Sequence, residues 1–202
     1  MQPFSSSSST SFEQTYIEAR TFTSASSTFS ILHSHFHEAW SLRLGTFLGA
    51  GNDTRCTLIT TFETFPFPEG LTPNIAAVDH AADPRAISTA AAARRLDELR
   101  RNWLNPHELG DWVPEIAPTA APGEEPRQYP DRFQPRTTEP AVKLRERTLN
   151  NLYNQRRQWL FDAHARLDRT AAATYGWPEI IGTDEALARL LALNLERPAA
   201  GR

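Results

Sequence analysis

Large apolar and polar side chains come close to alternating along residues 60–68, which read Thr-Thr-Phe-Glu-Thr-Phe-Pro-Phe-Pro. The large apolar members are Phe62, Phe65 and Phe67. This pattern indicates an extended segment that turns its rings toward a core. Because proline lacks an N–H and fixes φ, Pro66 and Pro68 indicate that the segment leaves any sheet there. The stretch therefore predicts an edge strand ended by prolines.

Apolar residues spaced three and four apart predict a helix over residues 29–44 and another from Asp83-Pro84 to Asn105-Pro106. Gly45 suits the end of the first helix. Asp83 suits the N-cap of the second, and Pro84 suits its first position. The apolar face of this second helix is predicted to be Ile87, Ala92, Leu96, Leu99 and Trp103.

The same spacing predicts a long helix over residues 141–173 and a final helix over residues 184–196. The predicted buried stripe of the long helix is Leu149, Leu152, Tyr153, Leu160, Ala163, Leu167 and Ala171. Tyr175-Gly-Trp-Pro178 is typical of a helix end, with Gly176 just past the helix and Trp177 folding back. Thr183 is the expected N-cap of the final helix. Its predicted buried residues are Leu187, Leu190, Leu191 and Leu195.

Two segments show neither the alternation typical of a strand nor the three-and-four spacing typical of a helix. Residues 106–140 contain eight prolines, a density that argues against any helix or sheet and predicts a long surface connection. Residues 1–28 are rich in Ser and Thr and are expected to be disordered. The sequence thus predicts an α+β fold that is mostly α. We expect a short mixed unit over residues 29–82 and a helical domain over residues 83–202.

Composition narrows the classes of function. The lone Cys56 excludes an intramolecular disulfide and a cysteine-based zinc site. No membrane span or secretory signal is visible, so we expect a cytoplasmic protein. The net charge of −3 argues against nonspecific nucleic-acid binding, but of the 21 basic residues only Lys143 is a lysine. Arginine offers planar, bidentate donors to phosphates and guanine edges, although a GC-rich coding sequence would also favour it.

Motifs that would carry catalysis or hold a metal are missing. His33 and His37 lie one helical turn apart, but no third ligand has the required spacing, so we interpret them as hydrogen-bonding side chains. Gly49-Ala-Gly-Asn-Asp53 lacks the Gly-Lys-Ser/Thr of a phosphate-binding loop. There is no Gly-x-Ser-x-Gly, no Gly-x-Gly-x-x-Gly and no Asn-Pro-Pro-Tyr tetrapeptide. We therefore expect no catalytic residue, metal or cofactor in this chain.

A series of motifs in fixed order points to a family. They are His33-Ser-His-Phe-His-Glu-Ala-Trp40, the block at 60–68, Arg101-Asn-Trp-Leu-Asn-Pro106, Thr148-Leu-Asn-Asn-Leu-Tyr-Asn154, Ala172-Ala-Thr-Tyr-Gly-Trp177 and Leu190-Leu-Ala-Leu-Asn-Leu-Glu-Arg197. Together they resemble the C-terminal part of MmeI-like restriction–modification proteins, which are S-adenosylmethionine-dependent DNA adenine methyltransferases. Cys56, Leu58 and Arg157 depart from the aromatic residue and the two prolines of that pattern, which suggests relaxed constraint.

The resemblance implies a division of labour. Residues 29–82 would end a target recognition domain, and residues 83–202 would form the C-terminal helical domain. The methyltransferase core and the S-adenosylmethionine site of the family would lie upstream, so this chain would be a truncated fragment or half of a split enzyme. Whether the chain has any enzyme activity of its own stays open, because it carries no catalytic motif.

Three functions follow as hypotheses. The first is a DNA-recognition fragment that binds double-stranded DNA through arginines on phosphates and polar side chains on bases. The predicted DNA-binding residues are Arg43, Arg55, Thr57, Thr60, Thr61, Arg145, Arg147 and Arg156. The second is a helical interaction module that complements a separate upstream methyltransferase polypeptide, with the phenylalanines of 60–68 at the interface. The third is a nonfunctional remnant. For each predicted residue, an ordinary surface position is the alternative.

Overall fold

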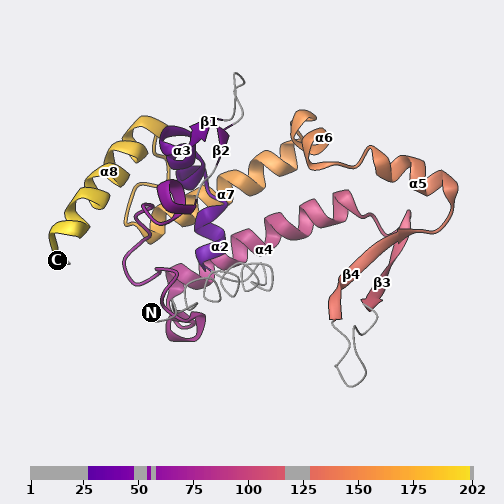
Figure 1. The fold of residues 1–202 in the computed structure, drawn as a ribbon, viewed down its shortest axis with the longest axis horizontal. Helices are drawn as coiled ribbons and strands as arrows, with labels where there is room; N and C mark the ends of the chain where they lie inside the picture. The colour runs from indigo at the N-terminus through magenta and orange to yellow at the C-terminus, as the bar shows by residue number, and fades with distance from the viewer. Residues whose placement is uncertain (1–26, 48–53, 56–57, 117–127, 201–202) are drawn as a thin grey trace, which may run out of the picture. The chain divides into compact units, whose positions relative to one another are not determined.

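The computed structural model describes residues 27–47, 54–55, 58–116 and 128–200 (Figure 1). Most of these residues are helical, and the strands form two small antiparallel pairs, so the expected α+β, mostly α class is confirmed. The chain divides into two compact units: residues 1–96 with 162–202 (unit 1), and residues 97–161 (unit 2). These units differ from the ranges 29–82 and 83–202, whose family assignment stays a prediction. No helix in the described part of the chain is long and apolar enough to cross a membrane.

The helix predicted over residues 29–44 is two helices, α2 (Ser27–Leu32) and α3 (His35–Leu44). Ser34 separates them because its backbone is extended and its hydroxyl donates to the Ile31 carbonyl at 2.6 Å. This side-chain bond competes with continuation of the helix. Asp168 then accepts the His35 backbone N–H at 2.8 Å, which caps α3 from a distant part of the chain. The end of α3 before Gly45 is confirmed.

The predicted strand at 60–68 is wrong. Residues Leu58–Phe62 form a π-helix, and the chain then turns. The Thr64 hydroxyl donates to the Thr60 carbonyl at 2.7 Å, a local bond that favours the turn over an extended strand. The only strands described nearby are the two-residue pair β1 (Thr46–Phe47) and β2 (Thr54–Arg55).

The predicted docking of aromatic rings on the core is confirmed. Phe65 and Phe67 are each 4% exposed and meet edge to face at a centroid distance of 5.0 Å. The Trp40 indole N–H donates to the Thr64 hydroxyl at 3.3 Å, and the Tyr175 hydroxyl donates to the Pro66 carbonyl at 3.1 Å. These bonds hold the stretch against α3 and the end of α7. The core of unit 1 consists of Ile31, Phe36, Trp40, Phe65, Phe67, Leu71, Ala86, Ala171, Ala172, Ala186 and Leu190.

Helix α4 (Pro84–Leu104) follows a short 3-10 turn at Ala77–His80 and begins and ends where the sequence predicts. Asp83 accepts the Arg85 N–H at 2.8 Å, as expected of an N-cap side chain. The predicted apolar face is correct at Ala92, Leu96 and Trp103 but wrong at Ile87, which is 51% exposed. The small residues Ala86, Thr89, Ala90 and Ala93 are buried instead, so the helix packs closely along a face that a search for large apolar residues does not find.

Residues 106–140 do form regular structure, contrary to the expectation from their prolines. Strands β3 (Gly110–Ile116) and β4 (Gln128–Pro135) pair antiparallel, and α5 (Thr138–Arg145) follows. In a two-stranded ribbon both strands are edges, so a missing N–H can face solvent. Pro114 lies at the irregularity in register between Val113 and Glu115, where one pairing is skipped.

The long helix predicted over residues 141–173 is also wrong. The chain forms α5, then α6 (Leu149–Asn154) and α7 (Gln158–Thr174). Thr148 caps the start of α6, because its hydroxyl accepts the Asn151 N–H at 3.2 Å. Arg156 has a φ of +45°, which interrupts the helical backbone between α6 and α7. Of the predicted stripe, Leu149 and Tyr153 are 52% and 42% exposed, while the other members are buried.

The C-terminal boundaries agree better with the sequence. Gly176 takes φ +69°, and the Trp177 N–H donates to the Ala172 carbonyl at 3.0 Å, so the predicted glycine end of α7 is confirmed. Trp177 stacks on Tyr175 at 4.4 Å. Helix α8 (Thr183–Ala200) begins one residue earlier and ends four residues later than expected, so Thr183 is its first residue and not its N-cap. Leu190 is buried, but Leu191 and Leu195 are 42% and 74% exposed, contrary to the prediction.

Candidate nucleic-acid interface

The DNA-binding residues predicted in unit 1 differ in their exposure to solvent. Arg43 in the last turn of α3 and Thr60 in the π-helix are exposed, and these two elements contact each other. Thr61 has no solvent exposure, so the prediction that it contacts DNA is wrong for the folded unit. Arg55 belongs to β2, but its side chain lies outside the described part. Thr57 falls outside the described residues.

In unit 2, Arg145 and Arg156 keep the exposed positions that a phosphate contact requires. Arg145 ends α5, and Arg156 lies in the turn between α6 and α7. Among the described residues, no carboxylate pairs with either guanidinium. Both side chains are therefore available to an external anion.

Local bonds fix the turn that carries Arg156. The Gln155 N–H donates to the Asn151 carbonyl and the Arg156 N–H to the Tyr153 carbonyl, each at 3.1 Å. Arg156 is the one described non-glycine residue with a positive φ. A left-handed conformation costs an L-residue on the order of 1–2 kcal/mol, so these surrounding bonds must hold it in place.

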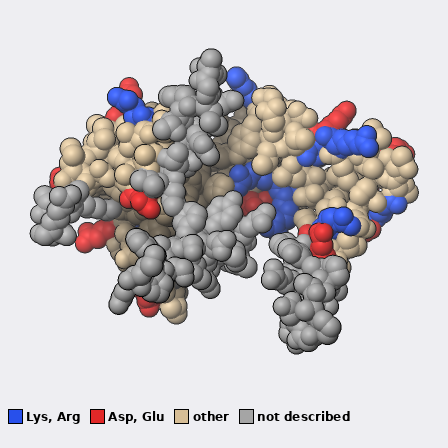
Figure 2. Space-filling model, in the orientation of Figure 1, with Lys and Arg blue, Asp and Glu red and all other residues tan. Residues whose placement is uncertain are grey.

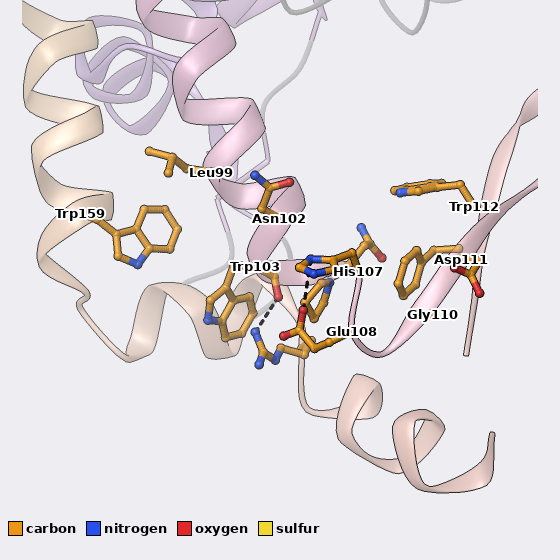
Figure 3. A pocket seen from close by; sticks show the side chains of 13 residues that line it. Leu99, Asn102, Trp103, His107, Glu108, Gly110, Asp111, Trp112 and Trp159 are labelled. Carbon is orange, nitrogen blue, oxygen red and sulfur yellow. Dashed lines mark hydrogen bonds and ion pairs between the residues drawn. The ribbon is translucent and has the colours of Figure 1, made fainter. Parts of the chain in front are cut away.

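Arg147 has a structural role instead. Its Nη1 donates to the Trp103 carbonyl at 2.8 Å, and its guanidinium lies 4.9 Å from the centre of the Trp103 ring (Figure 3). Arg157 approaches the same ring at 5.8 Å and donates to the Gln155 side chain at 2.8 Å. Two cations on one indole hold the α5–α6 connection and the start of α7 to the end of α4.

This cluster is not predicted by any sequence pattern. By sequence, Trp103 is only a member of an apolar helix face, and Arg157 is only a departure from a family pattern. Trp103 is 44 residues from Arg147 in the chain, and no periodic signal relates positions in different helices. The Trp103 indole N–H is itself buried without an acceptor in the described part of the chain.

Charge is concentrated on the segment that presents Arg145 and Arg156. Residues 143–157 contain five basic residues (Lys143, Arg145, Arg147, Arg156 and Arg157) and a single acidic one, Glu146, a surplus of four. Lys143 is bound to Glu139 at 2.7 Å. Figure 2 shows basic side chains over the region that α5 and α6 occupy in Figure 1, with acidic side chains among them. This surface contrasts with the net charge of −3 for the whole chain.

A hollow of about 590 Å³ opens in the same unit beside Trp112. Residues of α4, of the connection after it and of the ribbon line it: Asn102, Trp103, Asn105, His107, Trp112 and Phe133 (Figure 3). Asp111 also borders the hollow and forms two hydrogen bonds with Arg136, at 2.8 and 2.6 Å. These hydrogen bonds lower the pKa of the Asp111 carboxyl.

The histidines of α2 and α3 are held as separate side chains. The His33 ring packs on Phe29 at 4.1 Å, and the His37 ring packs on Phe65 at 5.1 Å. Burial lowers the pKa of His37, against the opposing effect of a hydrogen bond that its ring donates to the Leu32 backbone carbonyl. His35 Nδ1 lies 3.5 Å from Asp168. The described residues contain no cluster of three or more side chains able to hold a metal.

Comparison with known proteins adds no assignment. No protein-family model, no curated protein and no solved structure matches the chain. The resemblance to MmeI-like proteins therefore stays a prediction.

Proposed function

We propose that the chain is a cytoplasmic DNA-recognition fragment of a site-specific adenine-N6 methyltransferase of a restriction–modification system. The observation that supports this most directly is the basic surface of unit 2, where Arg145 and Arg156 are exposed and not paired with carboxylates of the described residues. Arginines in this state bind phosphates by releasing counterions from DNA. The motif order that resembles the MmeI-like family supports the methyltransferase part of the proposal.

Under this proposal the fragment binds DNA and does not catalyse methyl transfer. Phosphate contacts from Arg145 and Arg156 orient the protein on double-stranded DNA without reading sequence. Arg43 and Thr60 of unit 1 are the exposed members of the predicted set left for further DNA contacts. Methyl transfer from S-adenosylmethionine belongs, under this proposal, to an upstream methyltransferase polypeptide.

The salt dependence of DNA binding tests the proposal. Fluorescence anisotropy with a labelled duplex gives Kd over a series of salt concentrations for the wild type and for Arg145→Gln and Arg156→Gln. Each substitution is expected to reduce the slope of log K against log salt by about one, because each removes one phosphate contact.

Arg189→Gln is the charge-matched control. Arg189 is bound to Glu185 in α8 at 2.6 Å, so this variant changes the net charge equally and should leave the slope unchanged. A wild-type chain that does not bind duplex DNA at low salt would refute the proposal. Equal effects of all three substitutions would show a general charge effect and no local interface.

A second candidate, a helical module that binds the upstream polypeptide, is favoured by the outer face of α8. Leu191 and Leu195 are exposed there, as stated above. The phenylalanines expected at this interface do not serve it, because Phe65 and Phe67 are buried in the core of unit 1. Copurification that Leu195→Glu abolishes and Arg145→Gln leaves intact would support this candidate. A urea titration without a cooperative transition would instead favour the nonfunctional remnant.

A further inference from the structure

The hollow beside Trp112 is not used by the phosphate contacts proposed above. Trp112 lies on β3 directly opposite Phe133 of β4 and is 47% exposed. The two rings meet at a centroid distance of 5.4 Å and an angle of 67°, so Phe133 supports the indole from one side. Nearly half of a large aromatic side chain thus remains open to a ligand.

Gly110 makes this arrangement possible. A Cβ atom at this position would lie 2.7 Å from the Phe133 ring and would also meet the backbone carbonyl of Gln134. Only a residue without a side chain allows Phe133 to lie so close to β3. The aromatic pair that borders the hollow is therefore built into the pairing of the two strands.

Polar side chains face the hollow from the opposite side. Figure 3 shows Asn102 and His107 across the hollow from Trp112. Asn105 also lines it. Within the described part of the chain, the side-chain amides of Asn102 and Asn105 have no hydrogen-bond partner. An amide offers a donor and an acceptor side by side, which matches the edge of a nucleobase.

The charges around the hollow favour a neutral ligand. Asp111 is neutralised by Arg136, while the Glu108 carboxylate, 3.4 Å from His107, adds a negative charge to the lining. Among the described residues of the lining, the one guanidinium is that of Arg147, and it is held by Trp103. A phosphate would therefore gain little here, whereas a planar ring with polar edges could stack on Trp112 and bond to the amides.

We propose that this hollow accepts one unstacked nucleobase of a bound nucleic acid, with Trp112 as the stacking platform. The inference rests on the proposed DNA binding, since Arg145 and Arg156 would hold the backbone while the base enters the hollow. A volume of about 590 Å³ has room for a base and the water around it.

Duplexes with and without an extrahelical base test the inference. One short duplex carries a single bulged 2-aminopurine, and the other is the same sequence fully paired. The wild type is expected to bind the bulged duplex about tenfold more tightly and to quench the 2-aminopurine emission, because base–aromatic stacking gives an advantage of this order. Trp112→Ala should bring the affinity ratio close to one.

Two further variants guard against misfolding and general charge effects. Trp112→Phe keeps an aromatic platform beside Phe133 and should retain part of the ratio and of the quenching. Arg145→Gln should weaken binding to both duplexes and leave their ratio unchanged.

The outcomes separate the two proposals. Equal affinity of the wild type for the two duplexes would overturn the inference and leave the proposed DNA binding intact. Failure to bind either duplex would overturn both. A ratio that Trp112→Ala does not change would also refute the inference. If a proline decamer, and not the bulged duplex, binds in a Trp112-dependent manner, the hollow is a peptide site and the inference is wrong.

Discussion

Arg147 and Arg145 are two residues apart, and replacing each by glutamine should have opposite consequences. In Arg147→Gln the Trp103 carbonyl loses a charged donor at 2.8 Å, and the Trp103 ring loses a cation at 4.9 Å. A hydrogen bond from a charged group contributes about 1.5–3 kcal/mol, and a cation–π contact at a surface about 0.5–1 kcal/mol. Since one half-buried side chain makes both contacts, the terms are not additive, and we expect a loss of about 2 kcal/mol.

Arg145→Gln removes the same charge but no described contact. Its free energy of unfolding should stay within about 0.5 kcal/mol of the wild type, as for most surface substitutions. Urea unfolding followed by far-ultraviolet circular dichroism measures both variants, with the m-value checking that the transition keeps its cooperativity. DNA affinity should show the reverse order once binding is measured where both variants are folded. The reasoning is refuted if the two substitutions lower stability equally, or if Arg147→Gln has no effect.

Three further outcomes are expected from other parts of the chain. Burial lowers the pKa of His37 below its usual 6.5, so the unfolded state binds the extra proton and stability should fall as pH drops below about 6.5. His37→Gln should flatten this dependence in urea titrations at several pH values, and a dependence that persists in this variant would contradict its assignment to His37. Gly110→Ala should cost about 1–3 kcal/mol, because its Cβ meets the Phe133 ring and the Gln134 carbonyl. Adding Phe133→Leu to this variant removes the clash with the ring but not the clash with the Gln134 carbonyl, so it should restore only part of the lost stability. A thermal midpoint equal to that of the wild type would show that the clash with the carbonyl does not matter. Asp168→Ala should lower the thermal midpoint by an amount corresponding to about 1 kcal/mol, because α3 loses its cap. A midpoint equal to the wild type would show that solvent caps α3 as well as Asp168 does.

Local signals predicted some elements correctly and gave no indication of others. Asp83-Pro84 and Gly176 act through caps and backbone angles within a few residues, and the helix ends they predict are correct. The predicted helix over residues 141–173 failed because its periodicity passes through two interruptions. One is the Thr148 cap, and the other is the left-handed turn at Arg156, a residue type that gives no warning of a positive φ.

For the candidate site, the sequence predicted where arginines are concentrated but not which of them are free to bind DNA. Residues 143–157 hold a surplus of arginine, and two of the predicted contacts there, Arg145 and Arg156, are exposed as DNA binding requires. Arg147 could not be separated from them, because its partner Trp103 lies in α4, 44 residues away in the chain. Thr61 could not be recognised as buried, since the π-helix that turns it inward is not a feature of any simple periodic pattern.

The cap on α3 has a consequence for synthesis of the chain. Unit 1 is built from two stretches separated by all of unit 2, and the carboxylate that receives the His35 N–H belongs to residue 168. On the ribosome, α3 emerges more than a hundred residues before its cap, while unit 2 is already complete when Asp168 appears. The N-terminal part of unit 1 therefore cannot complete its core at this stage, because Phe36 and Trp40 do not yet pack with Ala171, Ala172 and Leu190. Contacts of such long sequence separation slow folding, so unit 1 should be the last part of the chain to become native.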